Sequence, residues 1–266
     1  MRPLQIADRI YALKGRWGIS PLNTWIYIVV DRGSSRLLLI DSGGSGSSRS
    51  IARALQEMGR SLADIAGIAL THWHADHTGG LCELLGLIDH PVTVYGGTAD
   101  MDIFLAQAAL PLKVRPFAFA PWGLQVPHHP GKRSTRQDIS YVRLTAENHR
   151  SALSEWHIEA LPTPGHTPGH TTYHLLPERA LFCGDALMHL AGHIYTLGFH
   201  HDLEQMDASA QWLLRQEFDW LLPAHVTPVR RRVPLARREN IGGQARGAVG
   251  LLDRFTAFKY QGTVGR

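Results

Sequence analysis

Cysteine is scarce in this 266-residue sequence, which contains only Cys82 and Cys183. Two cysteines with no second pair exclude a disulfide framework and a zinc site built on several thiolates. A chain of this length buries roughly 70–75% of its unfolded surface, so it needs no disulfide to hold its fold. The low cysteine content favours a reducing compartment.

Long apolar runs are also missing. No stretch approaches the ~18 apolar residues of a transmembrane helix, and segment 1–8 lacks the apolar core of a signal peptide. The hydrophobic fraction of 44% and the charged fraction of 19% are typical of a globular protein. These absences predict cytoplasmic localisation and no membrane partner.

Short apolar runs separated by turn residues fill most of the chain. Strands are expected at 25–30, 36–40, 65–70, 92–95, 157–161, 171–176, 180–183 and 220–222. Helices are expected around 51–58, 101–109 and 203–215, the last with Asp202 as its N-cap. Interleaved strands and helices predict an α/β or α+β layered fold.

Segment 97–150 differs from the rest because it combines a short helical pattern with many prolines. We interpret it as a helix-and-loop insertion within a single domain spanning 1–266, which ends in a basic segment, 226–266. The aromatic residues of the insertion either line an apolar cleft or pack the insertion onto the domain. They are Phe104, Phe117, Phe119 and Trp122.

The strongest functional signal directly follows the strand expected at 65–70. From His72 to His77 the sequence reads His-Trp-His-Ala-Asp-His, three imidazoles and one carboxylate. In a chain of this composition, a His-x-His-x-Asp-His pattern is expected about 0.003 times by chance. Imidazole and carboxylate suit Zn, Fe(II) or Mn, and the lack of nearby cysteine argues against a closed structural zinc site. The segment predicts a catalytic metal centre.

Three later segments place further metal-ligating side chains at turns or strand ends. Segment 163–170 reads Thr-Pro-Gly-His-Thr-Pro-Gly-His, in which proline and glycine sharply specify the backbone. Asp185 follows one expected strand and His225 follows another. Taken singly, such an aspartate is also typical of a turn or helix cap, and such a histidine of an ordinary surface or core residue.

In this order, the His-x-His-x-Asp-His, Gly-His, Gly-Asp and late-histidine motifs resemble the metallo-β-lactamase superfamily. The resemblance covers residues from about 10 to 230. It implies a four-layer αββα sandwich, with two facing β-sheets, helices on both outer faces and a metal site at one edge. It also implies two divalent metal ions, expected to be zinc, with iron or manganese as alternatives. The implied ligands are His72, His74 and His166 for the first ion, Asp76, His77 and His225 for the second, and Asp185 for both.

The resemblance further implies hydrolysis. Two dications ~3.5–4 Å apart hold a bridging hydroxide near neutral pH, and this hydroxide attacks a carbonyl or phosphoryl centre. Asp76 and His170 are the catalytic candidates beyond simple ligation. Asp76 is expected to accept a proton while it coordinates, and His170 to orient a ligand through a hydrogen bond.

Details of the motifs indicate the branch of the superfamily. Subclass B3 β-lactamases lack the bridging aspartate that Asp185 supplies, and flavodiiron proteins carry glutamate in place of His74. The turn from His166 to His170 is similar to that of thioesterases and lactonases, whereas RNase Z and related phosphodiesterases usually lack it. The sequence therefore predicts a hydrolase of a small-molecule ester, lactone or thioester.

Each close branch also departs from this sequence. Glyoxalase II is similar through 71–80 and 165–170, but it carries a long glutathione-binding helical tail where this sequence has 226–266. Acyl-homoserine lactonases place a tyrosine three residues after the bridging aspartate; Met188 stands there, and Tyr195 is a candidate substitute. Persulfide dioxygenases, which bind one iron through two histidines and the bridging aspartate, are the main alternative to a hydrolase.

Positive charge is concentrated late in the chain, whose formal net charge is +4. A phosphodiesterase or nuclease could bind phosphate there, but no aromatic stacking platform accompanies the arginines. A solvated tail or a homodimer contact is the preferred interpretation, and no nucleic-acid partner is expected. The cluster consists of Arg230, Arg231, Arg232, Arg237 and Arg238.

Overall fold

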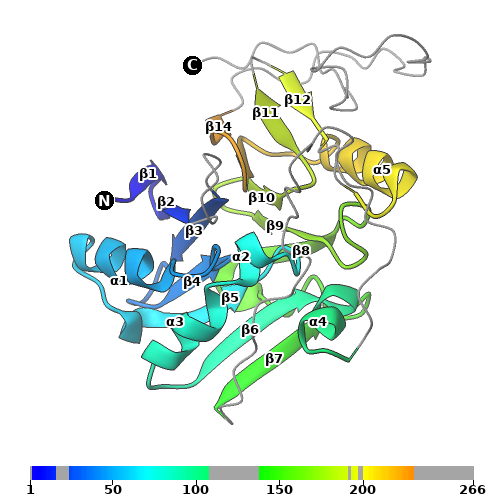
Figure 1. The fold of residues 1–266 in the computed structure, drawn as a ribbon. Helices are drawn as coiled ribbons and strands as arrows, with labels where there is room; N and C mark the ends of the chain where they lie inside the picture. The colour runs from blue at the N-terminus through cyan, green and yellow to red at the C-terminus, as the bar shows by residue number, and fades with distance from the viewer. Residues whose placement is uncertain (1, 16–23, 108–137, 191–192, 197–199, 231–266) are drawn as a thin grey trace, which may run out of the picture.

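The computed structural model describes residues 2–15, 24–107, 138–190, 193–196 and 200–230. Its strands form two main sheets (Figure 1). The first sheet has seven strands in sequence order: β1 (Leu4–Ala7), β2 (Ile10–Gly15), β3 (Thr24–Val30), β4 (Leu37–Ile40), β5 (Ile65–Ala69), β6 (Val92–Gly97) and β7 (Ile139–Leu144).

The second sheet has five strands in the order β14-β13-β10-β9-β8. These are β8 (Ile158–Pro162), β9 (Thr171–Leu175), β10 (Ala180–Gly184), β13 (Trp220–Pro223) and β14 (Val229–Arg230). A separate hairpin joins β11 (Met188–Leu190) and β12 (His193–Tyr195). The α-helices are α1 (Ser48–Glu57), α2 (Ala75–Thr78), α3 (Leu81–Leu87), α4 (Thr98–Phe104) and α5 (Leu203–Leu213), with 3₁₀ turns at Leu62–Asp64 and Ser154–Trp156.

Alternating side chains on the strands build three cores between four layers. In β3, Ile26 and Ile28 join the core shared with α1 and α3, whereas Tyr27 and Val29 join the core between the sheets. In β10, Phe182 faces Tyr27 across the two sheets, with ring centroids 5.2 Å apart. This alternation is the two-residue period of a strand that is buried on both faces.

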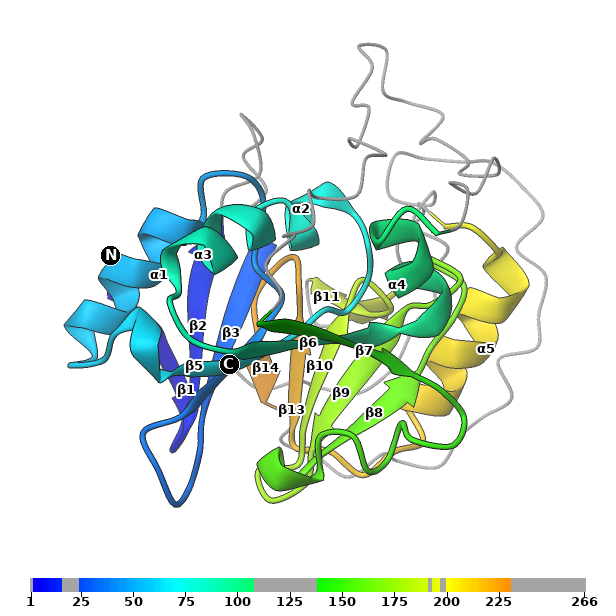
Figure 2. The same cartoon turned by 90° about the horizontal axis from the view of Figure 1, so that it is seen from below.

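The third core lies between the second sheet and α5. It contains Leu181 and Cys183 of β10 together with Ala210 and Leu213 of α5. Figure 2 shows α1 and α3 beside the first sheet and α5 beside the second. The predicted αββα sandwich is therefore confirmed.

Most expected elements occur within one or two residues of their predicted bounds. The N-cap of α5 is Asp202, whose side chain accepts a hydrogen bond from the backbone N of Gln205 at 3.0 Å. The expected insertion at 97–150 needs correction, because β7 pairs in parallel with β6 at the edge of the first sheet. The proline-rich sequence between β6 and β7 is typical of loops, so the pairing of β7 with β6 was not predicted.

Several predictions fall outside the described residues. Of the insertion aromatics, Phe117, Phe119 and Trp122 lie there, while Phe104 is buried in the core of α4 and packs near Tyr141. Of the basic segment 226–266, only the part up to Arg230 is described, and it contributes β14. No helix among the described residues is long and apolar enough to cross a membrane. The single-domain boundaries stay a prediction.

Candidate metal centre

All of the predicted ligands follow strand ends on one edge of the sandwich. Strands β4 and β5 are parallel, as are β10 and β13, so their carboxyl ends meet at this edge. The His-x-His-x-Asp-His segment follows β5, Asp185 follows β10 and His225 follows β13. The histidine turn 163–170 connects β8 to β9. The packing of the two sheets against each other therefore brings together four segments that are distant in sequence.

Hydrogen bonds between the sheets hold these strand ends in place. The Tyr173 hydroxyl donates to the backbone O of Leu70 at 2.7 Å, just before the motif after β5. The Tyr27 hydroxyl donates to Pro223 O at 2.6 Å, and the backbone N of Trp25 donates to Ala224 O at 2.7 Å, just before His225. The buried tyrosines thus fix the backbone that carries the candidate ligands.

His72, His74 and His166 converge on one point. The distance from His72 Nε2 to His74 Nδ1 is 2.9 Å, and His166 Nε2 lies 3.3 Å from the former and 3.1 Å from the latter. Metal–nitrogen bonds of ~2.0 Å in tetrahedral geometry give nitrogens about 3.3 Å apart. All three side chains are buried. Their spacing is that of three corners of a tetrahedral zinc site.

Asp76, His77 and His225 converge on a second point. Asp76 Oδ2 lies 3.3 Å from His77 Nε2 and 3.3 Å from His225 Nε2. Asp185 lies between the two groups: its Oδ2 is 3.4 Å from His166 Nε2, and its Oδ1 is 3.4 Å from His225 Nε2. One carboxylate therefore faces both groups, one oxygen toward each.

The donor set fits metal ions better than it fits internal hydrogen bonding. Three histidine nitrogens that point at one another cannot all be satisfied, because each contact needs one donor and one acceptor. His77 Nε2 and Asp185 Oδ1 are buried, make no hydrogen bond and lie 3.6 Å apart. A cation accepts electron pairs from all of these atoms at once, so the residues present fit divalent metal ions.

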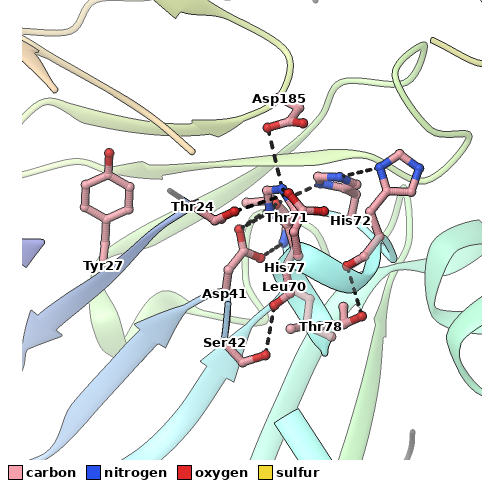
Figure 3. A network of polar contacts seen from close by, with 12 residues as sticks. Thr24, Tyr27, Asp41, Ser42, Leu70, Thr71, His72, His77, Thr78 and Asp185 are labelled. Carbon is pink, nitrogen blue, oxygen red and sulfur yellow. Dashed lines mark hydrogen bonds and ion pairs between the residues drawn. The ribbon is translucent and has the colours of Figure 1, made fainter. Parts of the chain in front are cut away.

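Asp41 organises the base of this site, although it belongs to none of the sequence motifs that indicate metal ligands. The carboxylate accepts hydrogen bonds from the backbone N of Thr71 at 2.7 Å and from the Thr71 hydroxyl at 2.8 Å. It also lies 2.8 Å from His77 Nδ1, on the side of the ring away from Asp185 (Figure 3). An aspartate on the far nitrogen of a ligating histidine fixes the ring and its tautomer. Its position directly after β4 was the only sequence signal.

His170 lies beside Asp185 and close to the first group, with its ring centroid 5.3 Å from that of His72. Its Nε2 accepts a hydrogen bond from the backbone N of Asp185 at 3.2 Å, so Nδ1 carries the proton and donates to Thr163 Oγ1 at 2.8 Å. Burial, the largest influence, lowers the pKa of His170 to about 3, so the ring is neutral. His170 therefore supports the backbone of Asp185, consistent with the orienting role expected for it.

The two groups of candidate ligands differ in charge. Burial and the neighbouring histidines lower the pKa of His72 and His74 well below the ordinary value. Burial also favours neutral His225, but the carboxylates of Asp185 and Asp76 outweigh it and raise the pKa of His225 to about 10. Without metal, His72 and His74 are therefore neutral, and the second group contains a histidine cation between two carboxylates.

We expect the metal-free protein to lose stability as pH rises from about 6.5 to 10. A histidine with a raised folded-state pKa stabilises the fold fully below its unfolded pKa of about 6.5 and loses that contribution as pH rises through the folded value. For His225 the folded value is about 10. Thermal melts in a chelating buffer should show a falling Tm over this window and a shallower fall in His225→Asn. Equal slopes in the two proteins would argue against the ion pairs of His225.

Comparison with known proteins places this geometry in a family. The sequence model of the metallo-β-lactamase superfamily matches residues 19–225. A hydroxyacylglutathione hydrolase from Alkalilimnicola ehrlichii is 33% identical over 187 residues, which is 70% of this chain and 55% of that protein. Thioesterase pkgB from Emericella nidulans is 26% identical over 212 residues, covering 79% of this chain and 47% of that protein. The chain thus spans about half the length of these relatives.

Solved structures agree on the fold. A metallo-β-lactamase family protein from Thermus thermophilus aligns with a TM-score of 0.57 at 20% identity, over 85% of this chain and 76% of that one. The resemblance expected from the ordered motifs is confirmed, and the described residues contain groups of buried histidine and aspartate side chains that could hold a metal ion. The chain belongs to the metallo-β-lactamase superfamily.

Proposed function

We propose that this protein is a dinuclear metal-dependent hydrolase of small thioesters, with esters and lactones as related substrates. The observation that carries the proposal is the placement of Asp185, whose two carboxylate oxygens face separate groups of ligating atoms. In each group, His72, His74, His166 and Asp76, His77, His225, the ligating atoms lie close enough together to hold one ion. We propose zinc as the native metal, with iron or manganese as alternatives.

Held by these residues, two divalent cations would supply a nucleophile from water near neutral pH and would polarise the scissile carbonyl. The residues of the chain position that chemistry. Thr24 Oγ1 donates to Asp76 Oδ2 at 3.2 Å, which fixes the carboxylate that we propose as proton acceptor. Asp41 holds His77 from behind, and neutral His170 holds the backbone of Asp185.

Thioesters are the preferred substrate class because the relatives named above are a hydroxyacylglutathione hydrolase and a thioesterase. The proposal concerns thioesters as a class and does not specify glutathione as the thiol. For lactones, Met188 occupies the position expected for tyrosine, and the β11–β12 hairpin pairs Met188 with Tyr195. The side chain of Tyr195 lies outside the described part of the chain.

A substrate panel tests this proposal. Zinc-loaded protein should be assayed with an acyl thioester, the matching oxygen ester, a lactone, a phosphodiester and a β-lactam. We expect kcat/KM for the thioester to exceed that for the phosphodiester and the β-lactam by at least about 100-fold, equivalent to ~2.7 kcal/mol of transition-state discrimination. Chelation should abolish hydrolysis, and added zinc should restore it.

Two results would contradict the proposal. Preferential hydrolysis of the phosphodiester would assign the protein to the nuclease-like branch. Iron-dependent oxygen uptake with a persulfide, without hydrolysis of any substrate in the panel, would support a mononuclear dioxygenase instead.

A further inference from the structure

Asp100 is a buried carboxylate that the proposed chemistry does not use. It lies in the first turn of α4, and only 3% of its surface is exposed. Its Oδ2 accepts hydrogen bonds from the Thr167 hydroxyl at 2.5 Å and from the backbone N of Trp73 at 3.3 Å. Its Oδ1 accepts a hydrogen bond from the backbone N of Gly169 at 2.5 Å.

These three donors come from both segments that supply the first group of ligands. Trp73 stands between His72 and His74, and Thr167 directly follows His166. One carboxylate therefore joins the loop after β5 to the histidine turn between β8 and β9. Among the described residues, no other side chain is hydrogen-bonded to both Trp73 N and the 167–169 backbone or side chains.

The backbone around Asp100 is closely packed against the histidine turn. A Cβ added to Gly97, the residue before α4, would clash with the carbonyl O of Gly169. A Cβ added to Gly169 would clash with the backbone N of Asp100. The start of α4 thus lies directly against the histidine turn, and the Asp100 side chain reaches across to Trp73.

A carboxylate is an unfavourable choice for a purely structural contact at this depth. Burial is the largest influence and raises the pKa of Asp100 to about 7, although the hydrogen bonds from the three donors lower this pKa. The charged form is therefore destabilised relative to water, whereas an apolar side chain would avoid this desolvation. A role in fixing the geometry between the two ligand-bearing segments accounts for a carboxylate at this position.

We propose that Asp100 is a positioning residue that sets the spacing between His74 and His166 and thereby preorganises the three-histidine metal site. The inference rests on the proposed metal site but not on the identity of the substrate. Asp100 acts on the ligands through its hydrogen bonds to Trp73, Thr167 and Gly169.

Metal binding tests this role without an activity assay. Metal-free Asp100→Asn should be titrated with Co²⁺, and its zinc affinity measured by competition with a chromophoric chelator. Asn places an amide N–H₂ against at least one of the three donors. We therefore expect zinc affinity to fall by about 10–100-fold, as for other residues that orient ligands. The visible Co²⁺ absorption of the first site should also weaken or shift.

Asp102→Asn is the matched control. Asp102 lies on the same helix, but it is partly exposed and pairs with Arg143 Nε at 2.6 Å. This variant should bind metal like the wild type. Circular dichroism and the Tm of the metal-free proteins establish that each variant is folded at the titration temperature.

A second pair of variants covers the case in which Asp100→Asn does not fold. Thr167→Val removes the hydroxyl donor to Asp100 at nearly constant volume, and Thr167→Ser retains it. We expect Thr167→Val to lower zinc affinity and alter the Co²⁺ spectrum, and Thr167→Ser to restore both.

Wild-type zinc affinity and an unchanged Co²⁺ spectrum in folded Asp100→Asn or Thr167→Val would overturn this inference, even with a lowered Tm. If the wild-type protein bound no metal, the proposed function would fail with it. Metal binding that is equal in wild type and variants would remove the positioning role alone.

Discussion

Asp185→Asn is expected to reduce kcat/KM by more than about 100-fold and to lower the amount of bound metal. Residues that only orient ligands are worth about 10–100-fold in affinity or activity, so loss of the shared ligand should exceed that range. Asn replaces one oxygen with an amide nitrogen that carries two hydrogens. Depending on which oxygen is replaced, either His166 or the pair His77 and His225 then faces an N–H donor instead of a carboxylate lone pair.

The same variant should change the titration of His225. Asp185 is the main carboxylate that raises the pKa of His225, so its neutralisation should lower that pKa in the metal-free protein. NMR titration of the histidine rings measures this directly. Asp219→Asn is the control, since Asp219 is half-exposed, pairs with Arg179 and precedes β13, whereas His225 follows that strand. Normal activity and metal content in Asp185→Asn would contradict the bridging role.

Asp41→Ala is expected to destabilise the metal-free protein by about 3–5 kcal/mol, the range for removing one partner of a buried charged pair. The substitution leaves the backbone N and hydroxyl of Thr71 and Nδ1 of His77 without their acceptor. Urea unfolding measures the loss of free energy of unfolding. An unchanged m-value would show that stability, and not the compactness of the unfolded state, has changed.

Asp41→Asn removes the charge of the side chain while it retains the backbone conformation. Asp41 has a φ of +62°, in the left-handed region that Asn also adopts readily. We therefore expect Asn to retain more stability than Ala but still to weaken metal binding by about 10–100-fold, because His77 loses its carboxylate partner. Metal affinity at the wild-type level in Asp41→Asn would show that His77 does not depend on this contact.

The ordered motifs carry chemistry at fixed spacing, and the structure brings the residues that they indicate into groups that could hold a metal ion. Strand order alone does not show that His72, Asp185 and His225 meet, because β5 lies in the first sheet and β10 and β13 lie in the second. The family resemblance implied it. The roles of Asp41 and Asp100 could not be predicted in this way. A single aspartate after a strand or in a helix turn is usually a cap, and only tertiary contacts show that these two hold ligand segments.

The fold was predictable where continuous apolar runs marked buried strands. The LLLI run of β4 and the apolar run of β5 are buried on both faces and were expected as strands. The position of β7 was not, because its residues follow a proline-rich stretch and pair with β6 across a long gap in sequence. The short β11–β12 hairpin was also missed, since three-residue strands give too little periodicity to detect.

The number of metal ions per chain tests the central claim most directly. After equilibrium dialysis against zinc, elemental analysis should give two ions per wild-type chain. His225→Ala should retain one, because the group His72, His74 and His166 is intact. A wild-type protein that hydrolyses thioesters at full rate with one ion or none would contradict the dinuclear site.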